Sequence, residues 1–317
     1  MRLRLSHFLS AALWLAVAGA HAQTLLPETR RDVAAQSAPP ALAPLRNTAA
    51  QSGATLTAGS GSAAYGRDFG EQEIVNRRAH PEPWTASADG QFFYTNNVAL
   101  TPSDRHGDWY GRYGATISYT NRIKGPVFLD FGLQEYFFRY ARYNALDFDL
   151  TRFQGGLLLQ VPKLDDTFLF ARYRLERITE AGFGSTLLTS HVAELGLQKV
   201  WKISRGQQIS AGLEADLPLD TDPRSAAREE YGLTLGYSLR LTEHLNTVLS
   251  YRGAYYRYSH TSRTDWNHIL ALDATYDLTD WARLGASVSF TSDTSNAAFG
   301  DYQNLVAGGS LSLRLSF

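Results

Sequence analysis

From residue 84 to the end, the chain alternates apolar and polar residues in segments of about 10 to 15 residues, separated by turn residues. In residues 231–241 the apolar side chains occupy every second position: Tyr231, Leu233, Leu235, Tyr237, Leu239 and Leu241. Because successive side chains of a strand point to opposite faces, this pattern predicts strands with one apolar and one polar face. We predict twelve strands, at residues 84–98, 110–121, 127–142, 148–161, 167–178, 190–201, 207–217, 231–241, 245–258, 266–278, 282–292 and 303–317.

The links between these strands alternate in length. Short links are expected near residues 122–126, 162–166, 202–206, 242–244 and 279–281. Longer links are expected near 99–109, 179–189, 218–230, 259–265 and 293–302, and only 143–147 is out of step. Alternating short turns and longer loops are typical of transmembrane β-barrels. We therefore predict an all-β fold, an antiparallel up-and-down transmembrane β-barrel of about twelve strands.

Prolines and aromatic residues support a barrel over a soluble β-sandwich. The five prolines after residue 84 are expected in links or at strand ends: Pro102, Pro126, Pro162, Pro218 and Pro223. The five tryptophans after residue 22 sort to the two ends of the strands, Trp84, Trp201 and Trp281 at the short-link end and Trp109 and Trp266 at the other. Tyrosines add to the second belt: Tyr94, Tyr110, Tyr231, Tyr255 and Tyr302. Such belts are expected where amphipathic rings meet lipid headgroups.

The last strand ends on an aromatic residue, with Leu311, Leu313, Leu315 and Phe317 on one face. This ending resembles the C-terminal signal of bacterial outer-membrane β-barrels, which the barrel-assembly machinery reads. The resemblance implies a Gram-negative outer membrane, with outer-membrane lipid and the assembly machinery as partners. Residues 263–317 are also similar to uncharacterised outer-membrane barrels, including the barrel part of surface-lipoprotein export factors. Those factors carry a helical-repeat periplasmic domain, and residues 23–83 show no such pattern.

The N-terminal part divides into two segments. Residues 1–22 are expected to be a cleaved signal peptide, with Arg2 and Arg4 before an apolar stretch too short to span a bilayer, and with Ala20-His21-Ala22 as the cleavage site. Residues 23–83 hold six of the 11 prolines and are rich in Ala, Ser and Gly. This composition predicts a flexible periplasmic extension, and a plug inside the barrel is the alternative. The barrel itself is predicted at 84–317.

Composition excludes several classes of function. The chain has no cysteine, so it can form neither disulfides nor thiolate metal sites. Its 30 Lys and Arg balance 31 Asp and Glu, which argues against a nucleic-acid surface. The histidines lack the spacing of metal ligands, and no phosphate-binding glycine loop is present. We predict no cofactor and no metal site.

An outward apolar face leaves sixteen charged residues as candidates for lining the lumen. They are Asp89, Arg112, Asp130, Arg152, Arg172, Arg174, Glu176, Glu194, Glu214, Asp216, Arg240, Arg252, Asp273, Asp277, Arg283 and Arg314. In one interpretation they line a narrow pore for small polar or charged solutes, with Arg152, Arg172 and Arg174 as its basic wall. In the other they pair with one another in a closed structural, assembly or export-accessory barrel. The passive channel is the leading prediction.

One cluster of residues offers an enzymatic alternative. His260 and Ser262 lie in a long link, with Asn267 nearby. They resemble the His-x-Ser pair and Asn of the outer-membrane phospholipase, which is also twelve-stranded. The flanking residues differ, and the spacing to the Asn is much shorter than in that family. Since a hydrolase needs base, nucleophile and orienting group within hydrogen-bond reach, we predict no catalytic residue and no enzyme.

Overall fold

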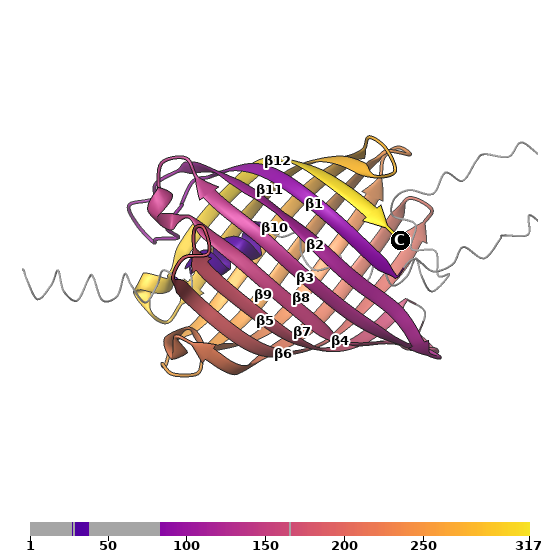
Figure 1. Cartoon of the computed structure of the whole chain (residues 1–317), viewed down its shortest axis with the longest axis horizontal. Coiled ribbons are helices and arrows are strands. Elements are labelled where there is room, and N and C mark those ends of the chain that lie inside the picture. Colours follow the sequence, from indigo (N-terminus) through magenta and orange to yellow (C-terminus); the bar gives the residue numbers. More distant parts are fainter. Residues whose placement is uncertain (1–26, 28, 38–82, 165) are drawn as a thin grey trace, which may run out of the picture.

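The protein is a closed antiparallel β-barrel of twelve strands (Figure 1), as the sequence predicts. The computed structural model describes residues 27, 29–37, 83–164 and 166–317, so the predicted signal peptide lies outside the described residues. The strands are β1 (Trp84–Thr95), β2 (Asp108–Lys124), β3 (Val127–Tyr140), β4 (Phe148–Gln160), β5 (Thr167–Glu180), β6 (Thr186–Ser204), β7 (Gln207–Asp222), β8 (Arg228–Arg240), β9 (Leu245–Tyr258), β10 (Thr264–Asp277), β11 (Ala282–Ser295) and β12 (Tyr302–Ser316). None of the described helices is long and apolar enough to cross a membrane.

Pairing of the first strand with the last closes the sheet. The β1–β12 ladder runs from Thr85↔Ser316 to Thr95↔Val306, and every other strand pairs with its neighbours in sequence. Closure leaves no strand edge unpaired, which a membrane requires because lipid cannot satisfy backbone hydrogen bonds. The first and last residues of the barrel lie at the same rim, where the backbone NH of Trp84 donates to the carbonyl of Phe317 at 3.1 Å.

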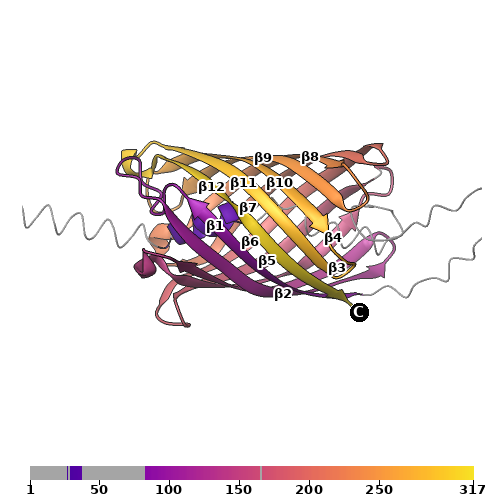
Figure 2. The ribbon, with the colours of Figure 1, turned by 90° about the horizontal axis from the view of Figure 1, so that it is seen from above.

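The two rims of the barrel differ. The rim that holds Trp84 and Phe317, here the short-turn end, has tight links such as 125–126 and 205–206. The opposite rim, the long-link end, carries the 96–107 link and the three short 3-10 helices: η1 (Asn144–Leu146), η2 (Arg224–Ala226) and η3 (Ala298–Gly300). Figure 2 shows the strands tilted between these two rims.

Several strands extend beyond their predicted ends, because pairing with a neighbour recruits polar residues that resemble a turn. β7 continues to Asp222 and includes Pro218, which the sequence placed in a link. The register between β6 and β7 shifts at this point, where Val192 faces Pro218 and His191 faces Asp220. A bulge of this kind lets a strand accommodate a proline that cannot donate a ladder hydrogen bond.

The outward face is apolar, as lipid requires. The five tryptophans of the barrel are between 43% and 55% exposed and sit toward the strand ends. Leu311, Leu313, Leu315 and Phe317 point outward as well. The expectation for Tyr110 and Tyr302 is wrong, because both are buried inside the barrel rather than in the aromatic belt.

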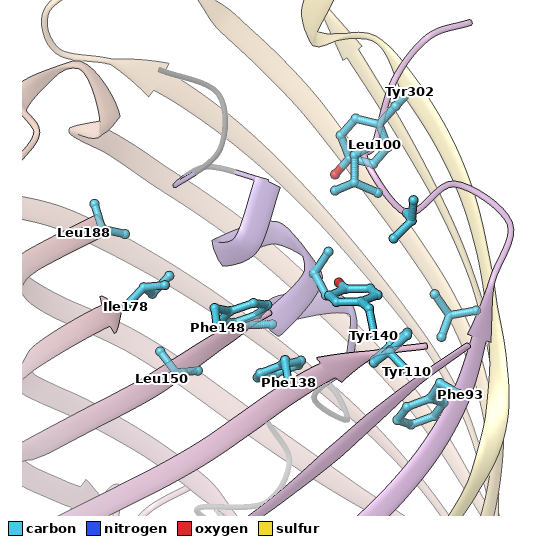
Figure 3. Close-up of a cluster of buried hydrophobic side chains, with 14 of the residues drawn as sticks. Phe93, Leu100, Tyr110, Phe138, Tyr140, Phe148, Leu150, Ile178, Leu188 and Tyr302 are labelled. Atoms are coloured by element: carbon cyan, nitrogen blue, oxygen red, sulfur yellow. The ribbon is translucent and has the colours of Figure 1, made fainter. Parts of the chain in front are cut away.

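Inside the barrel, the apolar side chains gather mainly toward the long-link end. Figure 3 shows this cluster, in which Phe138 stacks on Phe148 with ring centroids 4.2 Å apart. Its strand members come from one continuous run of neighbouring strands, from Tyr302 on β12 through Phe93 on β1 to Leu188 on β6. A smaller cluster joins Phe128, Leu158, Phe168 and the partly buried Phe170 toward the other rim. The inward face therefore carries apolar clusters of unequal size toward both rims, and charged side chains lie between them.

Candidate functional site: the barrel lumen

A short helix, residues 29–37, lies inside the barrel toward the long-link end (Figures 1 and 2). We call it the lumen helix. It is the described part of the predicted N-terminal extension, and its position matches the plug alternative. Arg30, Asp32, Val33, Ala34, Gln36 and Ser37 are each buried. A polar helix that is buried on several faces must find partners on several walls.

Two ion pairs hold the lumen helix from different sides. Arg31 Nε lies 3.5 Å from Glu176 Oε1 on β5, and Asp32 Oδ1 accepts a 2.9 Å hydrogen bond from Arg228 Nη2 on β8. Burial lowers the pKa of the Arg31 guanidinium, and the nearby Arg228 lowers it further. Arg31 stays protonated at neutral pH because the ordinary pKa of arginine is far higher. The four residues therefore form two pairs of opposite formal charge.

Hydrogen bonds fix the C-terminal turn of the lumen helix to two further strands. The hydroxyls of Ser37 and Tyr110 on β2 are 2.9 Å apart. Gln36 Nε2 donates to the Tyr302 hydroxyl at 3.3 Å, and Asn304 Nδ2 donates to Gln36 Oε1 at 2.7 Å, both on β12. Because β2, β5, β8 and β12 are spread around the barrel, the helix spans the bore rather than lying against one wall.

The apolar face of the lumen helix completes the internal cluster. Val33 and Ala34 pack into the cluster that contains Phe138, Tyr140 and Phe148. Figure 3 shows these rings beside the helix ribbon. A helix with its side chains is about 10–12 Å across, and this one contacts strands on several sides of the bore at this level.

Between the lumen helix and the short-turn end, a chain of ion pairs crosses four strands. Arg172 Nε lies 3.0 Å from Asp130 Oδ2, and its Nη1 lies 3.3 Å from Glu194 Oε1. Arg174 Nη1 lies 3.2 Å from Glu194 Oε2, and its other Nη bonds to Asp216. Arg172 and Arg174 of the predicted basic wall are therefore neutralised by carboxylates of β3, β6 and β7, and Arg152 is neutralised by Glu176 of β5. This is the mutual pairing of the second interpretation.

Further pairs join this chain to the lumen helix. Arg152 Nε donates to Glu176 Oε2 at 3.0 Å, so Glu176 holds a strand arginine and Arg31 of the helix together. On the other side, Arg252 lies 3.5 Å from Glu214 and bonds to Glu230. Glu230 was not among the residues predicted for the lumen, although it shares the inward face of its strand with Gly232 and Arg240.

Seven other predicted residues occupy the polar face of their strands: Asp89, Arg112, Arg240, Asp273, Asp277, Arg283 and Arg314. Arg112 lies 3.9 Å from Asp89, and Arg283 bonds to Asp277 at 2.5 Å. Asp273 is half-buried and forms no ion pair with any described residue. The wall formed by β10, β11, β12 and β1 therefore carries fewer paired charges, and hydroxyl residues and glycines fill its inward positions.

The residues of the enzymatic alternative do not form a hydrogen-bonded triad in the described chain. Asn267 is buried, and its amide donates to Asp293 at 2.7 Å and to Tyr302 at 3.3 Å. Ser262 lies in an exposed link, where its carbonyl accepts a hydrogen bond from Asn296. Among the residues that the structure describes, no group of three His, Asp or Glu side chains could hold a metal ion.

Sequence reasoning missed the aromatic cluster that packs against the lumen helix, although two signals existed. The run Tyr136-Phe137-Phe138-Arg139-Tyr140 puts aromatic rings on both faces of one strand, which indicates an apolar contact inside as well as lipid outside. Residues 28–37 also lack the proline and glycine of their surroundings, which permits a helix.

A closed twelve-stranded antiparallel barrel, apolar outside and charged within, has the fold of bacterial outer-membrane β-barrels. The chain is similar to an outer membrane channel from Pseudomonas putida F1, at 10% sequence identity, covering 77% of this chain and 100% of the channel with a TM-score of 0.53. It also aligns with the NanC porin at 8% identity, covering 72% of this chain and 100% of the porin, with a TM-score of 0.44. An anion-selective porin from Comamonas acidovorans aligns at 9% identity, over 73% and 98% of the two chains, with a TM-score of 0.38. At these identities the likeness concerns the fold. No family model and no curated protein matches the chain.

Proposed function

We propose that the protein is an outer-membrane channel for small polar or charged solutes, and that the lumen helix occupies its long-link end in the state described here. The observation that carries this proposal is the inward wall between the lumen helix and the short-turn end, where paired charges and hydroxyl residues line the lumen beside the small apolar cluster of Phe128, Leu158 and Phe168. Charged and polar linings of this kind are what aqueous pores use to replace the hydration of a solute. The similarity to the Pseudomonas channel supports the same function.

The ion-pair chain from Asp130 to Asp216 favours one other function, a closed barrel with a structural or assembly role. Mutual pairing satisfies the arginines without any solute, and so a lumen can be charged and still not conduct.

Conductance in planar bilayers separates the two functions. The mature chain is compared with a variant that lacks residues 23–82, after both are shown to be folded by their heat-dependent migration in gels. A channel gives discrete conductance steps that are larger or more frequent in the deletion variant, because the bore is no longer filled. A folded deletion variant that shows no steps would establish the closed barrel and end the channel proposal.

The orientation that we propose places both barrel termini and the short turns in the periplasm and the long-link end outside the cell. The absence of native cysteine makes this simple to test. A single cysteine at Thr261→Cys, in the link after β9, is expected to react with an impermeant maleimide on intact cells. A cysteine at Arg205→Cys, in a tight turn, is expected to react only after the outer membrane is permeabilised. The reverse pattern of labelling would invert the orientation.

A further inference from the structure

We propose that the lumen contains a peptide-binding seat, and that the lumen helix is its exchangeable occupant. The seat comprises Glu176, Arg228, Tyr110, Tyr302 and Asn304, together with the aromatic cluster around Phe148. Its ligand is a short helical peptide with an adjacent Arg–Asp pair, as in residues 29–37 of this chain. The inference concerns recognition inside the barrel and does not depend on conduction.

The charges of the seat give the bound helix one orientation. Arg31 and Asp32 are consecutive, so their side chains diverge by about 100° around the helix axis. They reach Glu176 on one wall and Arg228 on another. A helix inserted in the opposite direction could not satisfy both pairs and would bring like charges together, which is unfavourable in a buried site. The seat therefore recognises sequence and direction.

The seat keeps partners for its charged groups when the helix leaves, and this is the observation that makes the occupant exchangeable. Glu176 is also bonded by Arg152 at 3.0 Å, and Arg228 Nη2 lies 3.8 Å from Glu230. A buried charge that loses its only partner is strongly destabilising. Since Glu176 and Arg228 each have a second, strand-borne partner, release of the helix leaves no isolated buried charge in the wall.

Two hydrogen-bonding residues of the seat, Tyr302 and Asn304, follow the same rule. The Tyr302 hydroxyl also accepts from Asn267 at 3.3 Å, and Asn304 Oδ1 accepts from the Thr95 hydroxyl at 2.7 Å. The seat is thus supported by the barrel itself and is preorganised for a ligand. The helix has no such independent support, because isolated helices of this length are marginal in water. Folding of the segment is expected to accompany binding.

The test supplies the helix as a separate molecule. A fluorescent peptide of residues 23–40 is titrated into the folded variant that lacks residues 23–82, in detergent, and its anisotropy is measured. We expect saturable binding, weakened at least about 30-fold by Arg31→Glu in the peptide. The barrel variant that carries both Arg152→Glu and Glu176→Arg keeps this strand pair with its charges exchanged, and it is expected to restore binding of the Arg31→Glu peptide. Glu243→Arg, at an exposed carboxylate in the link between β8 and β9, is the matched control and is expected to change nothing.

The opposite results are equally clear. No saturable binding to a folded deletion variant, or equal binding of both peptides, would overturn the proposal. If the deletion variant does not fold, a protease site inserted after residue 60 of the full chain is cleaved after folding, and exchange of the released segment with labelled peptide is measured. Exchange supports the seat, whereas retention of the original segment despite excess peptide refutes an exchangeable occupant. Neither outcome depends on conductance, so this proposal and the channel proposal can fail separately.

Discussion

Substitution of Arg174 by methionine tests whether the ion-pair chain stabilises the barrel. Arg174 bridges Glu194, at 3.2 Å, and Asp216, and its side chain is 19% exposed. Without it, Asp216 has no ion-pair partner in the described chain, while Glu194 keeps Arg172 at 3.3 Å. Removing one partner of a buried ion pair lowers the free energy of unfolding by about 3–5 kcal/mol. Because Glu194 keeps its contact with Arg172 and Arg174 is partly exposed, we expect a loss near the lower limit, at about 3 kcal/mol.

The measurement is urea-induced unfolding of the barrel in lipid vesicles, followed by tryptophan fluorescence. Arg257→Met is the matched control, because Arg257 is 60% exposed and pairs with Glu229 at the surface. Its loss is expected to lower the stability much less than the loss of Arg174, because solvent screens an exposed ion pair. The double variant Arg174→Met with Asp216→Asn is expected to recover part of the stability, since no isolated carboxylate remains. Equal losses of stability in Arg174→Met and Arg257→Met would refute the reasoning that a buried ion pair stabilises the barrel more than an exposed one.

Two further substitutions test the barrel wall and its assembly. Gly156→Ala is expected to destabilise the barrel by about 1–3 kcal/mol in the same unfolding assay, because the added Cβ would lie 2.1 Å from the carbonyl oxygen of Ala171. Gly90→Ala is the control and is expected to be nearly neutral, because nothing lies within 4 Å of the added atom. Phe317→Ala is expected to reduce the fraction of folded barrel in the outer membrane, measured by heat-dependent gel migration. Refolding of the purified variant in vitro is expected to stay normal. A normal folded fraction in cells would show that the C-terminal residue has no role in assembly.

The barrel could be predicted from the sequence because its pattern is local. A strand in a membrane wall shows a two-residue period along its own length, and the parity of Leu311 to Phe317 follows from a few residues. The same parity could have corrected the placement of Tyr110. Arg112 was assigned inward, and Tyr110 lies two positions before it on the same strand, so both side chains point to the lumen. An aromatic belt would need Tyr110 to face outward, whereas the two-residue period of the strand turns it inward, as the structure shows.

The lumen helix could not be placed from the sequence because its contacts are not local. Arg31 meets Glu176 and Asp32 meets Arg228, pairs that are far apart along the chain and that come together only when the barrel closes. A segment of this length also carries little signal of its own, since short helices depend on tertiary packing. The sequence supplied the plug only as an alternative, and the seat that selects it is a property of the closed barrel.

Polar contacts rather than apolar burial hold the lumen helix in the barrel. Ordering each residue of a flexible segment costs about 1–2 kcal/mol, whereas full burial of a side chain like that of Val33 contributes only about 1.5–3 kcal/mol. Ala34 adds less because its side chain is one methyl group. Apolar burial by these two residues therefore cannot hold the helix, and the ion pairs of Arg31 and Asp32 act together with the hydrogen bonds of Gln36 and Ser37. Because the barrel keeps second partners for Glu176 and Arg228, the cost of losing these pairs falls mainly on the helix, and the wall can remain stable when the helix is absent.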